Sequence, residues 1–175
     1  DKRFRQAMSL AINRQAIIDT AFLGIGEPSQ VEPGAGSLFH DPKLAQAYVE
    51  FDSARADRLL DAAGLTHRDS EGMRSFGDGI RLEFYLLATT DMDAGAIQMI
   101  AEDWRKVGVR AKLRIRSQAL ARTEIEGLVH DFHVQASFAE FIPTSNPRSY
   151  VPFGGWCDFA PAYARWFMAG GVYGN

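Results

Sequence analysis

The sequence predicts an α/β fold with a mixed but mostly parallel sheet, and three consecutive stretches in the middle of the chain carry that prediction. Residues 80–88 alternate at first and then become fully apolar, as a strand buried on both faces does. Residues 97–107 place apolar side chains at helical spacing, and Gly108 follows where helices commonly end. Residues 109–115 alternate again. A strand, a crossover helix and a second strand almost always form a right-handed parallel unit, which we expect at the centre of the sheet.

The N-terminal part of the chain predicts two helices separated by a long connection. Asp1 can cap a helix whose apolar period continues up to that connection. The connection, residues 24–50, carries Gly and Pro repeatedly, and loops of this length tend to be functional or to wrap another surface. Asp52 is expected to cap a short helix that Gly64 ends. Residues 67–79, which are polar and rich in glycine, predict a surface excursion.

The C-terminal part predicts two helices and a third strand. Residues 118–127 have modest helical character, and residues 132–138 alternate as a strand does. Residues 139–161 contain several prolines and a glycine pair, which predict a second long irregular segment. Residues 162–169 predict a short helix that carries aromatic side chains.

Composition and charge limit the classes of function. The chain has 175 residues, 46% of them hydrophobic and 23% charged, which suits one ordinary globular domain. A formal net charge of -3 gives no overall reason to bind nucleic acid or an anionic membrane. The single cysteine, Cys157, rules out an internal disulfide and offers no metal cluster. Residues 1–5 do not resemble a signal peptide, and we expect the chain to be a piece of a longer protein.

Four passages resemble, in the right order, those of a family of large solute-binding proteins that serve ABC importers. Residues 4–18 are similar to a characteristic helix of that family, and residues 51–64 to a helix that follows an Asp and ends with Ala-Gly. Residues 97–109 match a helix-and-strand unit, and residues 161–171 resemble the ending of a peptide-binding branch. The family is family 5 of the extracytoplasmic solute-binding proteins, which includes oligopeptide, dipeptide and nickel types.

The resemblance implies a fold and a domain organisation. It implies a lobe of the type II periplasmic-binding-protein-like fold, with helices flanking the sheet and long loops between elements. Residues 1–175 are expected to form a single C-terminal lobe, whose N-terminal partner lobe and hinge strands lie elsewhere in a longer protein. Asn13 stands where the family usually has Asp, and residues 69–72 depart from an acidic glycine-rich loop of the family.

The resemblance also implies a function. Two lobes are expected to close around a di- or oligopeptide and to deliver it to an ABC transporter permease in the membrane. The protein is expected in the periplasm, secreted or lipid-anchored outside the cytoplasmic membrane. It is expected to be no enzyme, to use no cofactor or metal and to bind no nucleic acid. Sugars, nickel complexes and other small solutes are alternative ligands within the same fold family.

A ligand site is expected just after the third strand, because ligands of open α/β sheets lie beyond the carboxyl ends of the strands. The resemblance implies an aromatic residue near Phe138 and, near Glu140, a carboxylate that meets the amino group of the ligand. The alternative for Glu140 is a solvated loop carboxylate. Phe153 and Trp156 could stack on ligand side chains, and the alternative is that they pack within the loop. The expected ligand-binding residues are Phe138, Glu140, Phe141, Ser145, Asn146 and Trp156.

A basic stripe along the strand at residues 109–115 admits two interpretations. Its side chains share one face and could bind phosphate. The simpler interpretation is a solvent-exposed face or a charged edge that blocks the addition of another strand. Glu83 on the neighbouring strand could partly neutralise the positive charge of the stripe. The four residues of the stripe are Arg110, Lys112, Arg114 and Arg116.

Catalytic and metal-binding interpretations have weaker support. Asp91 and Asp93 could act as an acid and a base, but helix capping explains them more simply. His130 and His133 are three residues apart near a strand, where that spacing places them on opposite faces and disfavours a metal site. The sequence contains no Gly-x-Ser-x-Gly signature. An α/β hydrolase or transferase domain with an unrecognised site, and the ligand-sensing lobe of a regulator, are the alternatives to a transport protein.

Overall fold

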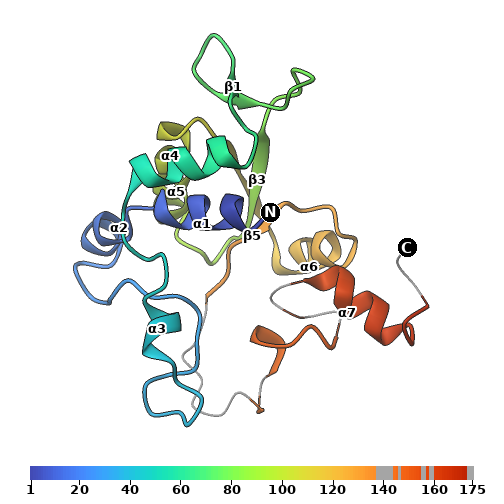
Figure 1. Cartoon of the computed structure of the whole chain (residues 1–175). Coiled ribbons are helices and arrows are strands. Elements are labelled where there is room, and N and C mark those ends of the chain that lie inside the picture. The colour runs from blue at the N-terminus through green and yellow to red at the C-terminus, as the bar shows by residue number, and fades with distance from the viewer. Residues whose placement is uncertain (137–143, 146, 155–156, 158–159, 173–175) are drawn as a thin grey trace.

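A computed structural model of the chain has an α/β architecture with helices on both faces of a small sheet (Figure 1). It describes residues 1–136, 144–145, 147–154, 157 and 160–172. The helices are α1 (Lys2–Leu10), α2 (Arg14–Ala21), α3 (Pro42–Ala45), α4 (Ser53–Ala62), α5 (Ala94–Lys106), α6 (Gln118–Glu126), α7 (Pro161–Met168) and the 3-10 helix η1 (Pro147–Ser149). The strands are β1 (His67–Arg68), β2 (Arg74–Ser75), β3 (Glu83–Thr89), β4 (Arg110–Arg116) and β5 (Phe132–His133).

The main sheet has the strand order β4-β3-β5, and all of its described pairs are parallel. β3 pairs with β4 along its whole length, and α5 crosses over between them, which confirms the predicted central unit. β5 is shorter than the predicted third strand. Its ladder ends at His133, although the Val134 N–H still donates to the Leu87 carbonyl at 2.8 Å. Residues 137 and 138 of the predicted strand lie outside the described residues.

The core lies between one face of the sheet and helices α1, α4 and α5 (Figure 1). Leu86 from β3 is buried there, and the Trp104 indole N–H donates to the Met8 carbonyl at 3.0 Å, which joins α5 to α1. The Phe132 ring lies 5.0 Å from Trp104 and 5.3 Å from Phe84, measured between centroids. Each buried apolar side chain of this size stabilises the fold by about 1.5 to 3 kcal/mol.

Helix α6 packs against β3 and β4, and Ala121 of α6 and Leu87 of β3 are both buried. The predicted helix caps are confirmed: Asp52 accepts a backbone N–H at 2.8 Å and begins α4, and Asp93 does so at 3.0 Å for α5. Gly108 follows α5 with a φ of +81°, a conformation that other residues rarely adopt. The short helix predicted near the C-terminus is confirmed as α7.

The predicted single helix from Asp1 to the long connection is wrong, because the chain bends between α1 and α2. The Asn13 N–H donates to the buried Asp103 carboxylate at 2.8 Å, and the Asn13 side chain caps α2 by accepting from the Ala16 N–H at 3.1 Å. Lys106 donates to the other Asp103 oxygen at 2.8 Å. Without the Asn13 N–H one buried carboxylate oxygen would lack a donor, which is costly, so this contact with α5 favours the break over a continuous helix.

The stretch between α4 and β3 is also more than the predicted surface excursion. It forms the antiparallel pair β1–β2, and Arg74 on β2 is fully buried. The Arg74 guanidinium donates to Asp57 and Asp61 on α4, in each case at 2.6 Å. It also donates to the Leu65 carbonyl and, at 2.9 Å, to the Val107 carbonyl. A polar sequence therefore joins α4 to the end of α5 through one buried cation.

The long connection between α2 and α4 is irregular, as predicted, except for the short helix α3. It extends away from the sheet in Figure 1. None of the helices in the described part of the chain has the length and apolar character that crossing a membrane requires.

Candidate functional site

The carboxyl ends of the three parallel strands surround a cavity of about 210 Å³. Ligands of open α/β sheets bind at this edge of the sheet. Thr89 at the end of β3 and Asp91 in the following turn line the cavity, as do Gln118 after β4 and His133 at the end of β5. Its other lining residues are Met92, Ala121, Arg122, Ile125, Gln135, Ala136, Arg148 and Cys157.

Capping residues shape the two turns that border this cavity. Asp93 begins α5, and Ser117 begins α6 by accepting a backbone N–H at 3.4 Å. The Thr90 N–H donates to the last carbonyl of β4 at 3.1 Å, which joins the turn after β3 to the end of the neighbouring strand. As a result, Asp91 and Gln118 lie next to each other, and the Gln118 amide donates to the Asp91 carboxylate at 3.0 Å.

Asp91 provides a negative charge at the cavity. Two hydrogen bonds lower the pKa of the Asp91 carboxyl below its ordinary value: the larger effect comes from the Thr89 side chain and the next from the Asp91 backbone N–H. Desolvation opposes this shift, and the Gln118 amide adds to it. Asp91 therefore remains ionised at neutral pH and can accept a hydrogen bond from an amide or ammonium group of a ligand.

Positive and neutral polar groups line the same cavity. Arg122 on α6 donates from Nε to Glu126 at 2.8 Å, and Arg148 lies in η1. Gln135 follows β5 and is exposed, whereas Cys157 is buried. One carboxylate, two guanidinium groups and two amides suit a ligand that has donors, acceptors and charges of both signs.

A second, more apolar cavity of about 480 Å³ lies on the other side of the end of β5. Leu86, Trp104 and Phe132 line it together with Val31 from the long connection between α2 and α4. His133 and Gln135 line both cavities, so the end of β5 separates them.

Of the predicted ligand-binding residues, Ser145 is the one that lies within the described part of the chain. Ser145 is exposed in a turn and does not line either cavity. Ala136, Arg148 and Cys157, which lie beside the predicted residues in the sequence, all line the polar cavity. Phe153 is 44% exposed and lines neither cavity. The predicted residues that lie outside the described part are Phe138, Glu140, Phe141, Asn146 and Trp156.

The basic stripe of β4 is paired with carboxylates of the same chain, which supports the charged-edge interpretation over phosphate binding. Lys112 contacts Glu83 at 2.9 Å, as predicted. Glu124 on α6 accepts from Arg116 at 2.7 Å and lies 3.5 Å from Arg114. The remaining pairs are Arg110–Asp69 at 2.8 Å and Arg110–Glu71 at 2.7 Å.

The acid–base and metal interpretations gain no support. Asp93 caps α5, as the simpler interpretation predicted, whereas Asp91 is not the cap and accepts from the Gln118 amide instead. The rings of His130 and His133 lie 6.4 Å apart between centroids. Within the described ranges, no group of three His, Cys, Asp or Glu side chains is arranged to hold a metal ion.

Sequence reasoning missed several residues of the polar cavity. Gln118 had a usable signal, because it directly follows a predicted parallel strand. Arg122 lies one helical turn further along α6, on the same face as Gln118. Arg148 and Cys157 belong to a long irregular segment, and no local pattern predicts where such a segment returns to the sheet.

Comparison with known proteins gives relatives of considerably greater length. The "Probable ABC transporter-binding protein" of Deinococcus radiodurans is 32% identical over 112 residues, which are 62% of this chain and 18% of that protein. "Di/tripeptide-binding protein 1" of Pseudomonas aeruginosa is 26% identical over 113 residues, which are 62% of this chain and 19% of that protein. The chain therefore spans less than a fifth of either relative.

A solved structure of an "oligopeptide-binding protein OppA" is similar over 98% of this chain and 28% of its own, with a TM-score of 0.84 and 32% identity. This likeness confirms the predicted type II periplasmic-binding-protein-like fold. The family model described as "Bacterial extracellular solute-binding proteins, family 5 Middle" matches residues 1–155. Three of the four passages that suggested the resemblance lie within that match. The chain belongs to the bacterial extracellular solute-binding proteins, family 5.

Proposed function

We propose that this chain is most of the C-terminal lobe of the substrate-binding component of an ABC importer, which captures peptides and delivers them to a membrane permease. The observation that carries this proposal is the polar cavity at the carboxyl ends of β3, β4 and β5, in a chain of this family. A relative named as a di/tripeptide-binding protein and a similar structure named as an oligopeptide-binding protein support peptide as the ligand class.

The chemistry of the cavity suits a peptide. Every peptide has backbone N–H and C=O groups, a positive amino terminus and a negative carboxyl terminus. Asp91 can accept from a peptide N–H or from the amino terminus. Arg122, Arg148 and the amide of Gln118 can donate to a peptide C=O or to the carboxyl terminus. Bridging waters adapt to different side chains, so one lining of this kind can serve many sequences.

The size of the cavity suits one wall of a larger cleft. Pockets that enclose small ligands usually measure about 300 to 1,000 Å³, and this cavity of about 210 Å³ is below that range. A second lobe that closes over it would complete the site. In such a protein the closed state gains contacts with the ligand that the open state lacks, so the ligand shifts the equilibrium toward closure.

Uncovered apolar surface supports a partner lobe in the same protein. Trp104 and Phe132, which pack in the core, line the apolar cavity beside β5. On α7, Tyr163, Phe167 and Met168 are 70%, 60% and 65% exposed. Exposed apolar surface often marks an interface, and the chain spans only 28% of the OppA structure that it resembles.

The ligand can be identified from the full-length protein purified without denaturation. Native mass spectrometry is expected to detect bound di- or oligopeptides, and peptides added to the protein are expected to be recovered uncleaved. A co-purified sugar or nickel complex would contradict the peptide class. Steady cleavage of added peptides would contradict a binding protein and favour the α/β enzyme alternative.

The isolated 175-residue chain is expected to bind the same peptides weakly or not at all, because it supplies one wall of the site. Isothermal titration of the isolated chain beside the full-length protein measures this, with circular dichroism as the control that the isolated chain is folded. A micromolar Kd for the isolated chain would contradict the two-lobed proposal.

The family description also supports a location outside the cytoplasmic membrane. We place the full-length protein in the periplasm, secreted or anchored by a lipid. Fractionation of cells that express the natural gene is expected to recover the protein in the periplasmic fraction or with membrane-anchored proteins that face the periplasm. Recovery with the cytoplasmic fraction would contradict this placement.

A further inference from the structure

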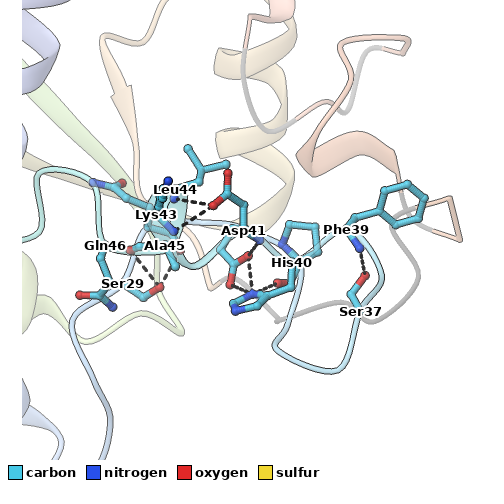
Figure 2. Close-up of polar contacts among 12 residues, drawn as sticks. Ser29, Ser37, Phe39, His40, Asp41, Lys43, Leu44, Ala45 and Gln46 are labelled. Atoms are coloured by element: carbon cyan, nitrogen blue, oxygen red, sulfur yellow. Dashed lines mark hydrogen bonds and ion pairs between the residues drawn. The ribbon is translucent and has the colours of Figure 1, made fainter.

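A buried carboxylate and a histidine close the far end of the long connection between α2 and α4 (Figure 2). His40 Nδ1 lies 2.8 Å from each carboxylate oxygen of Glu32 and 3.2 Å from the Pro33 carbonyl. The Asp41 N–H donates to the same carboxylate at 3.3 Å. The Glu32 side chain is only 8% exposed, and that of His40 is 25% exposed. We name this pair, Glu32 and His40, the clasp.

The clasp encloses a short tip, residues 33–39, that presents apolar side chains outward. Leu38 is fully exposed and Phe39 is 64% exposed. Two local hydrogen bonds turn the chain within the tip: the Ser37 N–H donates to the Gly34 carbonyl at 2.8 Å, and the His40 N–H donates to the Ser37 carbonyl at 3.2 Å. Apart from these turns, the clasp is the described contact that joins the two ends of the tip.

The base of the same connection is held differently. The Gln30 N–H donates to the Ala45 carbonyl at 2.8 Å, and the Gln30 side chain donates to the Ala47 carbonyl at 2.7 Å. The Gln46 side chain donates to the Pro28 carbonyl at 3.3 Å. None of these groups titrates near neutral pH, whereas the clasp contains an imidazole, which does.

The surroundings of His40 define where its protons lie. The carboxylate and the carbonyl around Nδ1 are acceptors, so Nδ1 carries a proton whether the ring is neutral or charged. A second proton, on Nε2, adds a positive charge opposite the buried Glu32 carboxylate. The hydrogen bond then becomes charge-assisted on both sides, which makes it roughly twice as strong as a neutral one.

We propose that the clasp is a pH-sensitive device that holds the Leu38–Phe39 tip firmly when His40 is protonated and less firmly as the pH rises. Val31, next to Glu32 in the chain, lines the apolar cavity beside β5. Loosening of the clasp therefore reaches the border of that cavity as well as the tip. The base of the connection stays in place, because its hydrogen bonds are neutral at every physiological pH.

The direction of the effect follows from the groups that face His40. The Pro33 carbonyl, then the Glu32 side chain, raise the pKa of His40 above its ordinary value, and Asp41 adds a weaker attraction. Glu32 and Asp41 are the charged groups that act on the ring, and Asp41 itself caps α3 through the Lys43 N–H. Because the pKa is raised on folding, the stabilisation is complete below about pH 6.5 and is lost as the pH rises through the folded value.

Residue-resolved hydrogen exchange of the full-length protein at about pH 5.5 and about pH 8.5 tests the proposal, after correction for the intrinsic exchange rate at each pH. Protection of the His40 and Asp41 amides is expected to fall by about threefold or more at the higher pH. Protection of the Gln30 amide is expected to change by less than that. An equal change at tip and base, or none at the tip, would overturn the proposal.

Variants separate the clasp from other causes. In His40→Asn a side-chain amide replaces Nδ1 as a donor and cannot titrate, so the pH dependence at the tip is expected to disappear. Glu32→Gln is expected to reduce it in the same way. Gln46→Ala, which removes a contact of the base, is expected to keep the full pH dependence at the tip. A pH dependence that survives in His40→Asn would show that another group is responsible.

Discussion

Arg74 is a fully buried cation whose partners lie on different elements of the fold. The carboxylates that it meets are partly hydrated, with the Asp57 and Asp61 side chains 41% and 50% exposed. Its remaining side-chain hydrogen bonds go to the Leu65 and Val107 carbonyls, in buried contacts, and to the Asp57 carbonyl at 3.2 Å. The carbonyl contacts, more than the ion pairs, should therefore decide how much this residue stabilises the protein.

Arg74→Met is expected to lower the free energy of unfolding by about 2 to 4 kcal/mol, because two carbonyls lose their buried donor while the two carboxylates remain hydrated. Urea unfolding measures the difference. Arg58→Met, at an exposed position on α4, is the matched control and is expected to change stability by no more than about 0.5 kcal/mol. Equal losses in the two variants would contradict a special role for the buried guanidinium.

Gly108 has a positive φ and also lies in a crowded position. A Cβ atom there would meet the Arg68 side chain, Arg74 Cγ at 3.0 Å and the Gly72 carbonyl at 3.1 Å. Gly64 has a φ of +90° but open space around it. Both Ala variants should pay the backbone penalty of about 1 to 2 kcal/mol. Gly108→Ala is expected to lose about 1 kcal/mol more, from overpacking; chemical unfolding that gives the two variants equal losses would refute this difference.

The strand β4 forms one edge of the described sheet, and its basic side chains are tied to the β1–β2 hairpin and to α6. Hydrogen bonding by Arg110 lowers the pKa of Asp69, and hydrogen bonding by Arg116 lowers the pKa of Glu124. Because both pKa values are lowered in the folded state, the stabilisation is present above an unfolded pKa of about 4 and is lost as the pH falls through the folded values.

Glu124→Gln is therefore expected to lose less stability than the natural chain when the pH is lowered from about 7 to about 3. The midpoint of urea unfolding at the two pH values measures this loss. Glu27→Gln changes an exposed carboxylate that makes no ion pair in the described part of the chain, and it should keep the full acid sensitivity. The same acid sensitivity in all three proteins would argue against a contribution from the β4 edge.

Local patterns in the sequence were sufficient for most elements. The alternation of β3 and β4, the helical period of α5 and the caps at Asp52 and Asp93 depend on neighbouring residues, and all were predicted. The break before α2 was not, because it depends on a hydrogen bond to Asp103, which lies 90 positions away from Asn13. The burial of Arg74 was missed for the same reason, since partners on three elements create its site.

The candidate site was less predictable than the fold. Its place at the carboxyl ends of the strands follows from the parallel order of the sheet, which the sequence predicted correctly. Asp91 was recognised only as a possible catalytic or capping residue, and Gln118 was not considered. Arg148 and Cys157 reach the cavity through a long segment whose path no periodicity specifies. The predicted ligand-binding residues from Phe138 to Trp156 therefore stay a prediction.

For the molecule as a whole, the polar cavity and the uncovered apolar surface support a single physical proposal. In this proposal the polar cavity at the carboxyl end of the sheet is one wall of a ligand site, and a second lobe of a longer protein covers the apolar side chains on α7 and beside β5. Closure of a second lobe would then join binding of the solute to a change of shape that a permease can recognise.

A pair of matched variants tests this proposal most directly. Ala136 lines the polar cavity and is exposed, whereas Ala119 is exposed on α6 and does not line it. Isothermal titration of the full-length protein, with a peptide recovered from it, should show that Ala136→Trp raises the Kd by about tenfold or more, equivalent to about 1.4 kcal/mol. Ala119→Trp should leave the Kd unchanged. Equally tight peptide binding by Ala136→Trp and the natural protein would contradict the assignment of this cavity as a wall of the peptide site.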